Sequence, residues 1–132
     1  MVLTDIVQID RIAYDFIGGC GGQLINVDMA DYDRIRADAV RLKAVKVEIR
    51  NRSELKSLGD EIGSLLEDGI SGIIVSVHCA RQSKLKVKDM DLIRKAAHLD
   101  DDRLSVALFG LADDDSLPAG SVSVFAVAGY RQ

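Results

Sequence analysis

Leu24-Ile25-Asn26-Val27-Asp28-Met29-Ala30-Asp31 follows a glycine cluster at residues 18–22 and leads into a predicted helix. Its polar residues, Asn26, Asp28 and Asp31, place one amide and two carboxylates at the spacing N-x-D-x-x-D. Asx side chains at a helix start accept hydrogen bonds from free backbone N–H groups, and acidic residues there interact favourably with the helix dipole. Asp28, Asp31 and Asp33 all suit this purely structural role, which stays open beside a role in chemistry.

The composition indicates a folded protein. The chain has 132 residues, 48% of them hydrophobic and 29% charged, which suits one domain with a real core. The net charge of -4 does not favour a nucleic-acid surface. The two cysteines lie far apart, the first residues do not form a signal peptide, and no apolar run reaches the length of a membrane span. We therefore expect a cytoplasmic protein without nucleic-acid partners and without a membrane span.

Hydrophobic periodicity predicts four helices and four strands. The helices are expected over about 3–17 and 29–42, after Ser53, and over about 88–98. The first helix has two apolar seams, which suits either a helix deep in its own domain or one packed between two domains. The strands are expected over 44–50, 72–77, 103–111 and 121–128.

Two of these strands carry further information. The alternation in residues 44–50 predicts a half-exposed strand, whereas the nearly continuous apolar run in residues 72–77 predicts a central strand covered on both faces. The order of elements fits an α/β fold, namely a two-layer domain with one mixed four-stranded sheet.

Three segments in this order resemble the C-terminal domain of the FtsZ/tubulin family. Residues 24–31 resemble the synergy loop, and residues 72–77 resemble the family's G-x-L-V-N-I strand. Residues 104–114 and 117–129 resemble its closing hairpin, which ends V-x-V-x-x-x-x-G, here at residues 122–129. The resemblance divides the single domain 1–132 into the end of a connecting helix (1–17), a synergy-like loop (24–31) and an α/β sheet domain (32–132). The charged residues 42–52 depart from the family pattern, and the family's GTP-binding domain has no counterpart in these 132 residues.

The resemblance implies half of an active site. Asn26, Asp28 and Asp31 would act on the GTP of a neighbouring FtsZ/tubulin-like subunit or of a second copy. Asn26 would contact the nucleotide or its metal-water shell, and the two carboxylates would position the attacking water. The chain alone is expected to bind no cofactor and no metal, so it would supply a loop in filament assembly, or cap filaments if free-standing.

The other motifs in the sequence give weaker indications of function. The glycine cluster lacks the G-x-x-x-x-G-K-[ST] arrangement and the tubulin family's own phosphate loop, so we expect a flexible helix exit there. His78 and Cys79 have no second Cys/His pair at ligand spacing, which favours ordinary packing at a strand end. The basic connection 81–88 is expected to be a solvated loop.

Two alternatives remain beside the filament role. One is a small oligomeric enzyme of chorismate-mutase-like or YjgF-like architecture, with an inter-subunit site in which Arg50, Arg52 or Arg81 binds a carboxylated substrate. The other is a purely structural domain whose partner lies on another chain.

Overall fold

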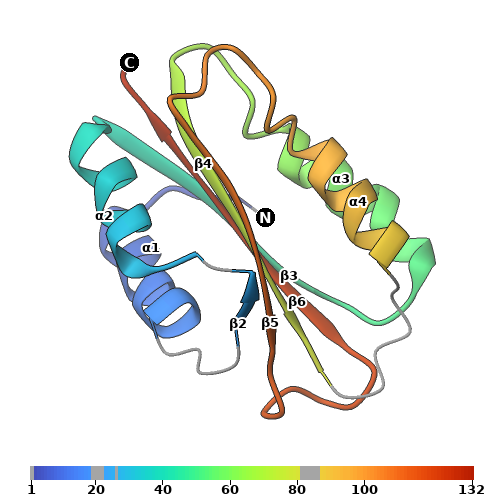
Figure 1. Ribbon diagram of the computed structural model, residues 1–132. Coiled ribbons are helices and arrows are strands. Elements are labelled where there is room, and N and C mark those ends of the chain that lie inside the picture. Colours follow the sequence, from blue (N-terminus) through green and yellow to red (C-terminus); the bar gives the residue numbers. More distant parts are fainter. Residues whose placement is uncertain (1, 19–22, 26, 81–86) are drawn as a thin grey trace.

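The computed structural model describes residues 2–18, 23–25, 27–80 and 87–132 (Figure 1). The strands within these residues form one mixed six-stranded sheet in the order β1-β3-β6-β4-β5-β2. They are β1 (Val2–Leu3), β2 (Gln23–Ile25), β3 (Arg41–Ile49), β4 (Ile70–Cys79), β5 (Val106–Asp113) and β6 (Val122–Tyr130). The helical elements are α1 (Ile6–Ala13), a π-helical turn η1 (Tyr14–Gly18), α2 (Met29–Asp38), a 3-10 turn η2 (Arg52–Glu54), α3 (Leu55–Gly63) and α4 (Val87–Ala96).

Strand β4 lies inside the sheet, parallel to β5 on one side and antiparallel to β6 on the other. Its side chains alternate between two cores: Ile73 and Val75 pack with α3 and α4, and Ile74 packs with α1 and α2. The prediction that residues 72–77 form a strand covered on both faces is confirmed.

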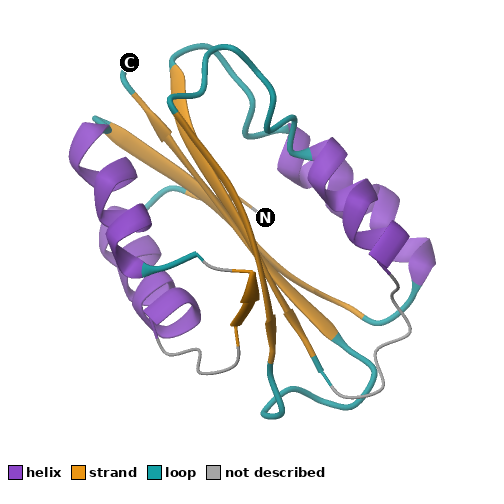
Figure 2. Cartoon of the chain, viewed as in Figure 1, coloured by secondary structure: helices purple, strands orange, loops and turns teal. Residues whose placement is uncertain are grey.

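The α/β class and the mixed sheet are confirmed, whereas the predicted two layers are wrong. Figure 2 shows helices on both faces of the sheet, with α1 and α2 on one face and α3 and α4 on the other. The apolar residues of β4 and β6 on both faces explain this arrangement, because a single helical layer would leave one apolar face in water. The four expected strands are present, and the two short strands β1 and β2 lie at the edges in addition.

The first helix begins later than predicted. Leu3 pairs with Ala44 as part of β1, and the helix starts at Ile6 because Asp5 caps it. Oδ1 of Asp5 accepts hydrogen bonds from the N–H groups of Val7 and Gln8 at 2.9 and 3.2 Å.

The two apolar seams predicted for the first helix are buried to different extents. Ile9, Ala13 and Phe16 of one seam are buried against the sheet, whereas Val7 and Tyr14 of the other are 66% and 58% exposed and its last residue, Ile17, is buried. The helix is therefore not buried deep in its own domain, which was one of the two alternatives. None of the helices in the described segments is long and apolar enough to cross a membrane.

The second helix ends earlier than predicted, at Asp38 instead of residue 42. Leu42 belongs to β3, where it pairs with Gly129 of β6 and is buried. Strand pairing and burial thus override the helical spacing of Leu42. The alternation predicted for residues 44–50 is present, with Val45 and Ile49 buried and Lys46 exposed.

Candidate functional site

Asp28 and Asp31 form a reciprocal cap at the start of α2. Oδ1 of Asp28 accepts a hydrogen bond from the N–H of Asp31 at 3.1 Å, and Oδ2 of Asp31 accepts one from the N–H of Asp28 at 3.0 Å. This capping box satisfies two backbone donors that a helix start otherwise leaves free. The structural role considered for these two residues is therefore present.

Each carboxylate also keeps one oxygen outside the capping box. Asp28 is exposed, and Asp31 is half-buried with Nη2 of Arg34 at 4.0 Å from its Oδ1. Val27, just before the cap, is buried, and β2 brings the chain to this point from the sheet edge. Asn26, the third predicted site residue, lies outside the described residues. The two described carboxylates thus stand side by side at one helix end, where they can accept hydrogen bonds from water.

Helix α2 is tied to α1 by a polar contact. The Tyr32 hydroxyl donates a hydrogen bond to Asp10 Oδ1 at 2.5 Å, and Arg36 Nε lies 3.2 Å from the same oxygen. Burial of the phenol and its bond to Asp10 raise the pKa of Tyr32, so the hydroxyl stays protonated and acts as a donor. These bonds hold the first turns of α2, and with them Asp28 and Asp31, in a defined place on the domain.

Two glycines of the sheet allow α2 to pack closely against it. A Cβ on Gly129 would lie 2.8 Å from Cγ2 of Ile35, and a Cβ on Gly72 would lie 3.0 Å from Cγ1 of the same residue. Helix α2 therefore approaches β4 and β6 more closely than side chains would permit. These glycines open the motif at residues 72–77 and close the motif at residues 122–129, so both motifs serve to place α2.

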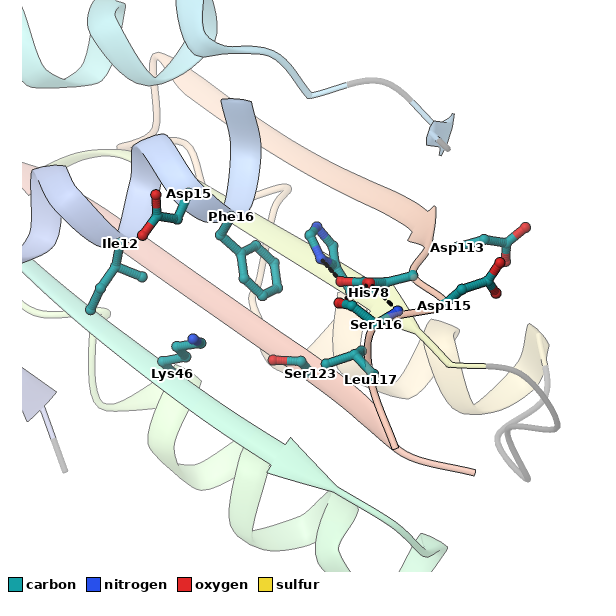
Figure 3. Close-up of a pocket in the computed structure, with 11 residues that line it drawn as sticks. Ile12, Asp15, Phe16, Lys46, His78, Asp113, Asp115, Ser116, Leu117 and Ser123 are labelled. Atoms are coloured by element: carbon teal, nitrogen blue, oxygen red, sulfur yellow. Dashed lines mark hydrogen bonds and ion pairs between the residues drawn. The ribbon is translucent and has the colours of Figure 1, made fainter. Parts of the chain in front are cut away.

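An open cavity of about 580 Å³ lies beside η1 at one end of the sheet (Figure 3). Its wall combines apolar, acidic and basic side chains from six elements (α1, η1, β3, β4, β5 and β6) and from the β5–β6 turn. The lining residues are Ile12, Asp15, Phe16, Lys46, His78, Asp113, Asp114, Asp115, Ser116, Leu117 and Ser123. Sequence reasoning did not anticipate this cavity, because its residues come from distant segments that only the sheet register brings together.

His78 of β4 contacts two other residues of the cavity wall, Asp114 in the β5–β6 turn and Phe16 in η1. Its Nδ1 lies 3.2 Å from Oδ2 of Asp114, and its ring stacks on Phe16 with the centroids 3.6 Å apart. Burial lowers the pKa of His78, while the Asp114 carboxylate and a hydrogen bond with the backbone of Phe16 oppose this shift. The carboxylate of Asp114 and the ring and backbone of Phe16 thus hold the imidazole in place, which agrees with the predicted packing role.

Cys79 is a poor nucleophile in this setting. Burial of the thiol and the nearby charge of Asp113 raise its pKa to about 11, so the reactive thiolate is scarce at neutral pH. In the described parts of the chain, no group of three or more His, Cys, Asp and Glu residues is arranged to hold a metal ion.

The arginines named for a carboxylated substrate are engaged elsewhere. Nη2 of Arg50 lies 3.3 Å from Glu48, and Nε of Arg52 lies 3.0 Å from the buried carboxylate of Asp89. Arg81 lies outside the described residues. The two described arginines do not converge on a common cleft with free guanidinium groups, so the enzyme alternative receives no support from them.

No protein-family model and no curated protein matches the chain. A mutant of FtsZ from M. jannaschii matches 93% of this chain with a TM-score of 0.61 and 20% sequence identity, over 38% of the FtsZ chain. An empty FtsZ dimer from M. jannaschii matches 96% of this chain with the same TM-score and identity, over 37% of its own chain.

The chain spans less than two fifths of the length of these FtsZ proteins. At this level of identity the match concerns the fold. The resemblance predicted from residues 24–31, 72–77 and 122–129 is confirmed at that level, and the chain has the fold of a C-terminal-like domain of FtsZ.

Proposed function

We propose that this chain is an FtsZ-like assembly domain that presents Asn26, Asp28 and Asp31 to the GTP site of a neighbouring subunit. The observation that carries the proposal is the pair of carboxylates capping α2 in a domain with the FtsZ fold. The neighbour, an FtsZ/tubulin-like subunit or a second copy, would hold the nucleotide. Assembly would then complete the site, and GTP hydrolysis would depend on contact between subunits.

In this proposal the chain contributes to hydrolysis by positioning the attacking water. Phosphoryl transfer to water depends mainly on the alignment of the attacking water and on the placement of charge around the phosphate. The outer oxygens of Asp28 and Asp31 would accept hydrogen bonds from that water and orient its lone pair toward the γ-phosphate. The amide of Asn26 would donate to the nucleotide or to the water shell of its metal.

The fixed position of α2 on the domain supports this role. The capping box fixes the two carboxylates relative to each other, and the contacts of Tyr32 and Ile35 fix α2 on the domain. A water held by such groups loses little orientational freedom during reaction, because the positions of its acceptors are set before the subunits meet.

The test mixes the chain with an intact FtsZ-type protein from the same organism and follows GTP turnover and pelletable polymer together. The double variant Asp28→Asn, Asp31→Asn removes both charges, while Asn at the cap position still accepts a backbone hydrogen bond. The matched control is Asp5→Asn, which makes the same change at the cap of α1.

The proposal predicts that the wild-type chain and Asp5→Asn change turnover or polymer mass alike, and that the double variant does not. Since these 132 residues contain no phosphate-loop motif of the family's pattern, the chain should cap the nucleotide-bearing filament end and lower polymer mass at substoichiometric amounts. Polymer mass and turnover that stay unchanged with the chain in excess would refute the assembly role. Equal effects from the double variant and the wild type would refute the role of the two carboxylates.

A further inference from the structure

The cavity beside η1 lies at the end of the sheet where β4 and β5 end and β6 begins. Strands β4 and β5 are parallel and finish here, at Cys79 and Asp113. The register places His78 of β4 directly beside Ser123 of β6, and β3 lies on the other side of β6. In open α/β sheets, ligands bind preferentially outside the carboxyl ends of parallel strands, so this end of the sheet is a favourable place for a site.

Ser123 directs a buried hydroxyl into this cavity. The residue is only 5% exposed and lines the cavity, and Figure 3 shows its oxygen pointing toward the space between Phe16 and Lys46. Among the described residues the Ser123 hydroxyl has no hydrogen-bond partner, whereas the buried hydroxyl of Ser71 donates to the carbonyl of Gly129. Because buried hydroxyls are normally hydrogen-bonded, the partner of Ser123 is expected to be a molecule that enters the cavity.

Lys46 offers a second donor at the same space. Its ammonium group lies 5.8 Å from the centre of the Phe16 ring and lines the cavity together with Ser123. No carboxylate in the described segments lies within ion-pair distance of this ammonium group, whereas Lys43 of the same strand pairs with Glu67 at 2.7 Å. An ammonium group and a hydroxyl that border one space together suit a carboxylate of a ligand.

Acidic side chains line other parts of the wall. Asp15 of η1 lies on one side, and the acidic residues 113–115 lie on the other, at the start of the β5–β6 turn (Figure 3). Hydrogen bonds with Ser116, and then with His78, lower the pKa of Asp114, so this carboxylate is ionised at neutral pH. Four carboxylates therefore line the cavity against one ammonium group, which favours an occupant with a net positive charge.

Apolar side chains complete the wall, namely Ile12, Phe16 and Leu117. The carboxylates in the described residues are not grouped in a way that would hold a metal ion. An organic cation with an aliphatic portion matches this wall better than a metal ion, because it covers the apolar surface and still reaches separate carboxylates. The cavity volume of about 580 Å³ is in the range of small-molecule sites.

We propose that this cavity binds a basic α-amino acid, a molecule with one carboxylate and two cationic groups. Lys46 and Ser123 would donate hydrogen bonds to the ligand's carboxylate, and Asp15 would accept from its α-ammonium group. Residues 113–115 would pair with the side-chain cation, and the aliphatic stem would lie on the apolar wall. The site does not depend on the proposed GTPase role, since none of these groups belongs to residues 24–31.

The probes are L-arginine and two molecules that each lack one of its charged groups. Agmatine lacks the carboxylate, and L-norvaline lacks the guanidinium group. The ¹⁵N-labelled chain is titrated with each probe at neutral pH and followed by NMR. L-Arginine should shift the amides of His78, Ser123 and residues 113–117 in a saturable manner. Agmatine and L-norvaline should each bind about tenfold more weakly, as expected for the loss of one charge-assisted contact.

Variants assign the charged groups of the ligand to the wall. Lys46→Gln should weaken L-arginine about fivefold to tenfold without weakening agmatine, which has no carboxylate. Ser123→Ala should act in the same direction with a smaller effect. The double variant Asp113→Asn, Asp115→Asn should weaken L-arginine and agmatine but not L-norvaline. The matched control is Lys56→Gln, which changes an exposed lysine of α3 on the other face of the sheet and should bind like the wild type.

The proposal is overturned if L-arginine produces no saturable shifts at these amides. It is also overturned if agmatine or L-norvaline binds as tightly as L-arginine, or if Lys46→Gln weakens L-arginine and agmatine equally. A tripeptide ending in arginine that binds about tenfold more tightly than the free amino acid would show instead that the chain end of a partner protein occupies the cavity.

Discussion

Ile35 of α2 lies directly over Gly129 of β6, so closely that a Cβ on the glycine would stand 2.8 Å from Cγ2 of Ile35. The same Cβ would lie 3.1 Å from Cβ of Ala39, one turn further along the helix. The absence of a side chain at residue 129 therefore sets the distance between α2 and the sheet, and with it the position of the Asp28–Asp31 cap.

Replacing Gly129 with alanine is expected to destabilise the fold. The added methyl group must displace α2, and such overpacking costs about 1–3 kcal/mol of unfolding free energy. Urea denaturation measures the change. The matched control is Gly63→Ala at the end of α3, where a Cβ meets nothing within 4 Å, so that variant should be as stable as the wild type or slightly more so. Equal losses in the two variants would contradict the close approach of α2.

Loss of the cap at α2 should be visible in stability, apart from any role in hydrolysis. Asp28→Ala removes the acceptor for the N–H of Asp31 and should lower the unfolding free energy by about 0.5–2 kcal/mol. Asp28→Asn should lose much less, because the amide oxygen still accepts the bond. Thermal and urea unfolding of both variants check this, and an alanine variant as stable as the asparagine variant would show that the cap contributes nothing.

Acidification should weaken the fold through His78. Burial lowers the pKa of this residue in the folded chain, whereas in the unfolded chain it returns to about 6.5. Between these two values the unfolded state binds more protons, so the unfolding free energy is fully retained above about pH 6.5 and falls as the pH decreases toward the folded pKa. Asp114 also has a lowered pKa, mainly through its bond with Ser116, and its own loss comes only in more acidic solution.

The measurement compares unfolding at about pH 7.5 and about pH 5.5, on either side of the reference value. His78→Gln should lose less stability than the wild type over this interval. Asp114→Asn should lose more, because the carboxylate that favours the protonated ring is gone. Parallel pH profiles for wild type and His78→Gln would rule out His78 as the source.

The buried carboxylate of Asp89 should make Arg52 a stabilising residue. Asp89 is fully buried and Arg52 Nε lies 3.0 Å from its Oδ1, so Arg52→Met leaves a buried charge with one donor fewer. The loss is expected to be about 1–3 kcal/mol, as for an unsatisfied buried group. Arg50→Met is the control, because its pair with Glu48 is exposed and such pairs contribute about 0–1 kcal/mol. Denaturant midpoints of the two variants should differ clearly, and similar midpoints would refute the role of Arg52.

Strongly periodic segments were predictable from the sequence. The alternation in residues 44–50 and the apolar run in residues 72–77 correspond to β3 and β4, because a strand's burial on one or two faces is written directly into its residue pattern. Asx residues before apolar periodicity likewise predicted the start of α2 among Asp28, Asp31 and Asp33, and the structure places the cap at Asp28. The roles of Asn26, Asp28 and Asp31 in hydrolysis stay predictions.

Short segments and close contacts were not predictable in the same way. Val2–Leu3 becomes β1 because the backbone of Ala44 and Val45 is available to pair with it, and two residues carry no period of their own. The place of His78 against Phe16 and Asp114 likewise depends on which strands lie side by side.

The amino-acid pattern was sufficient for the α/β class, the four long strands and the cap at Asp28, since local burial and backbone hydrogen bonding impose these features on neighbouring residues. The three layers, the cavity at His78 and the close packing of α2 on Gly72 and Gly129 arise when segments far apart in the chain meet. Their physical cause is the space and the partners that one element leaves for another, and no single segment contains that information.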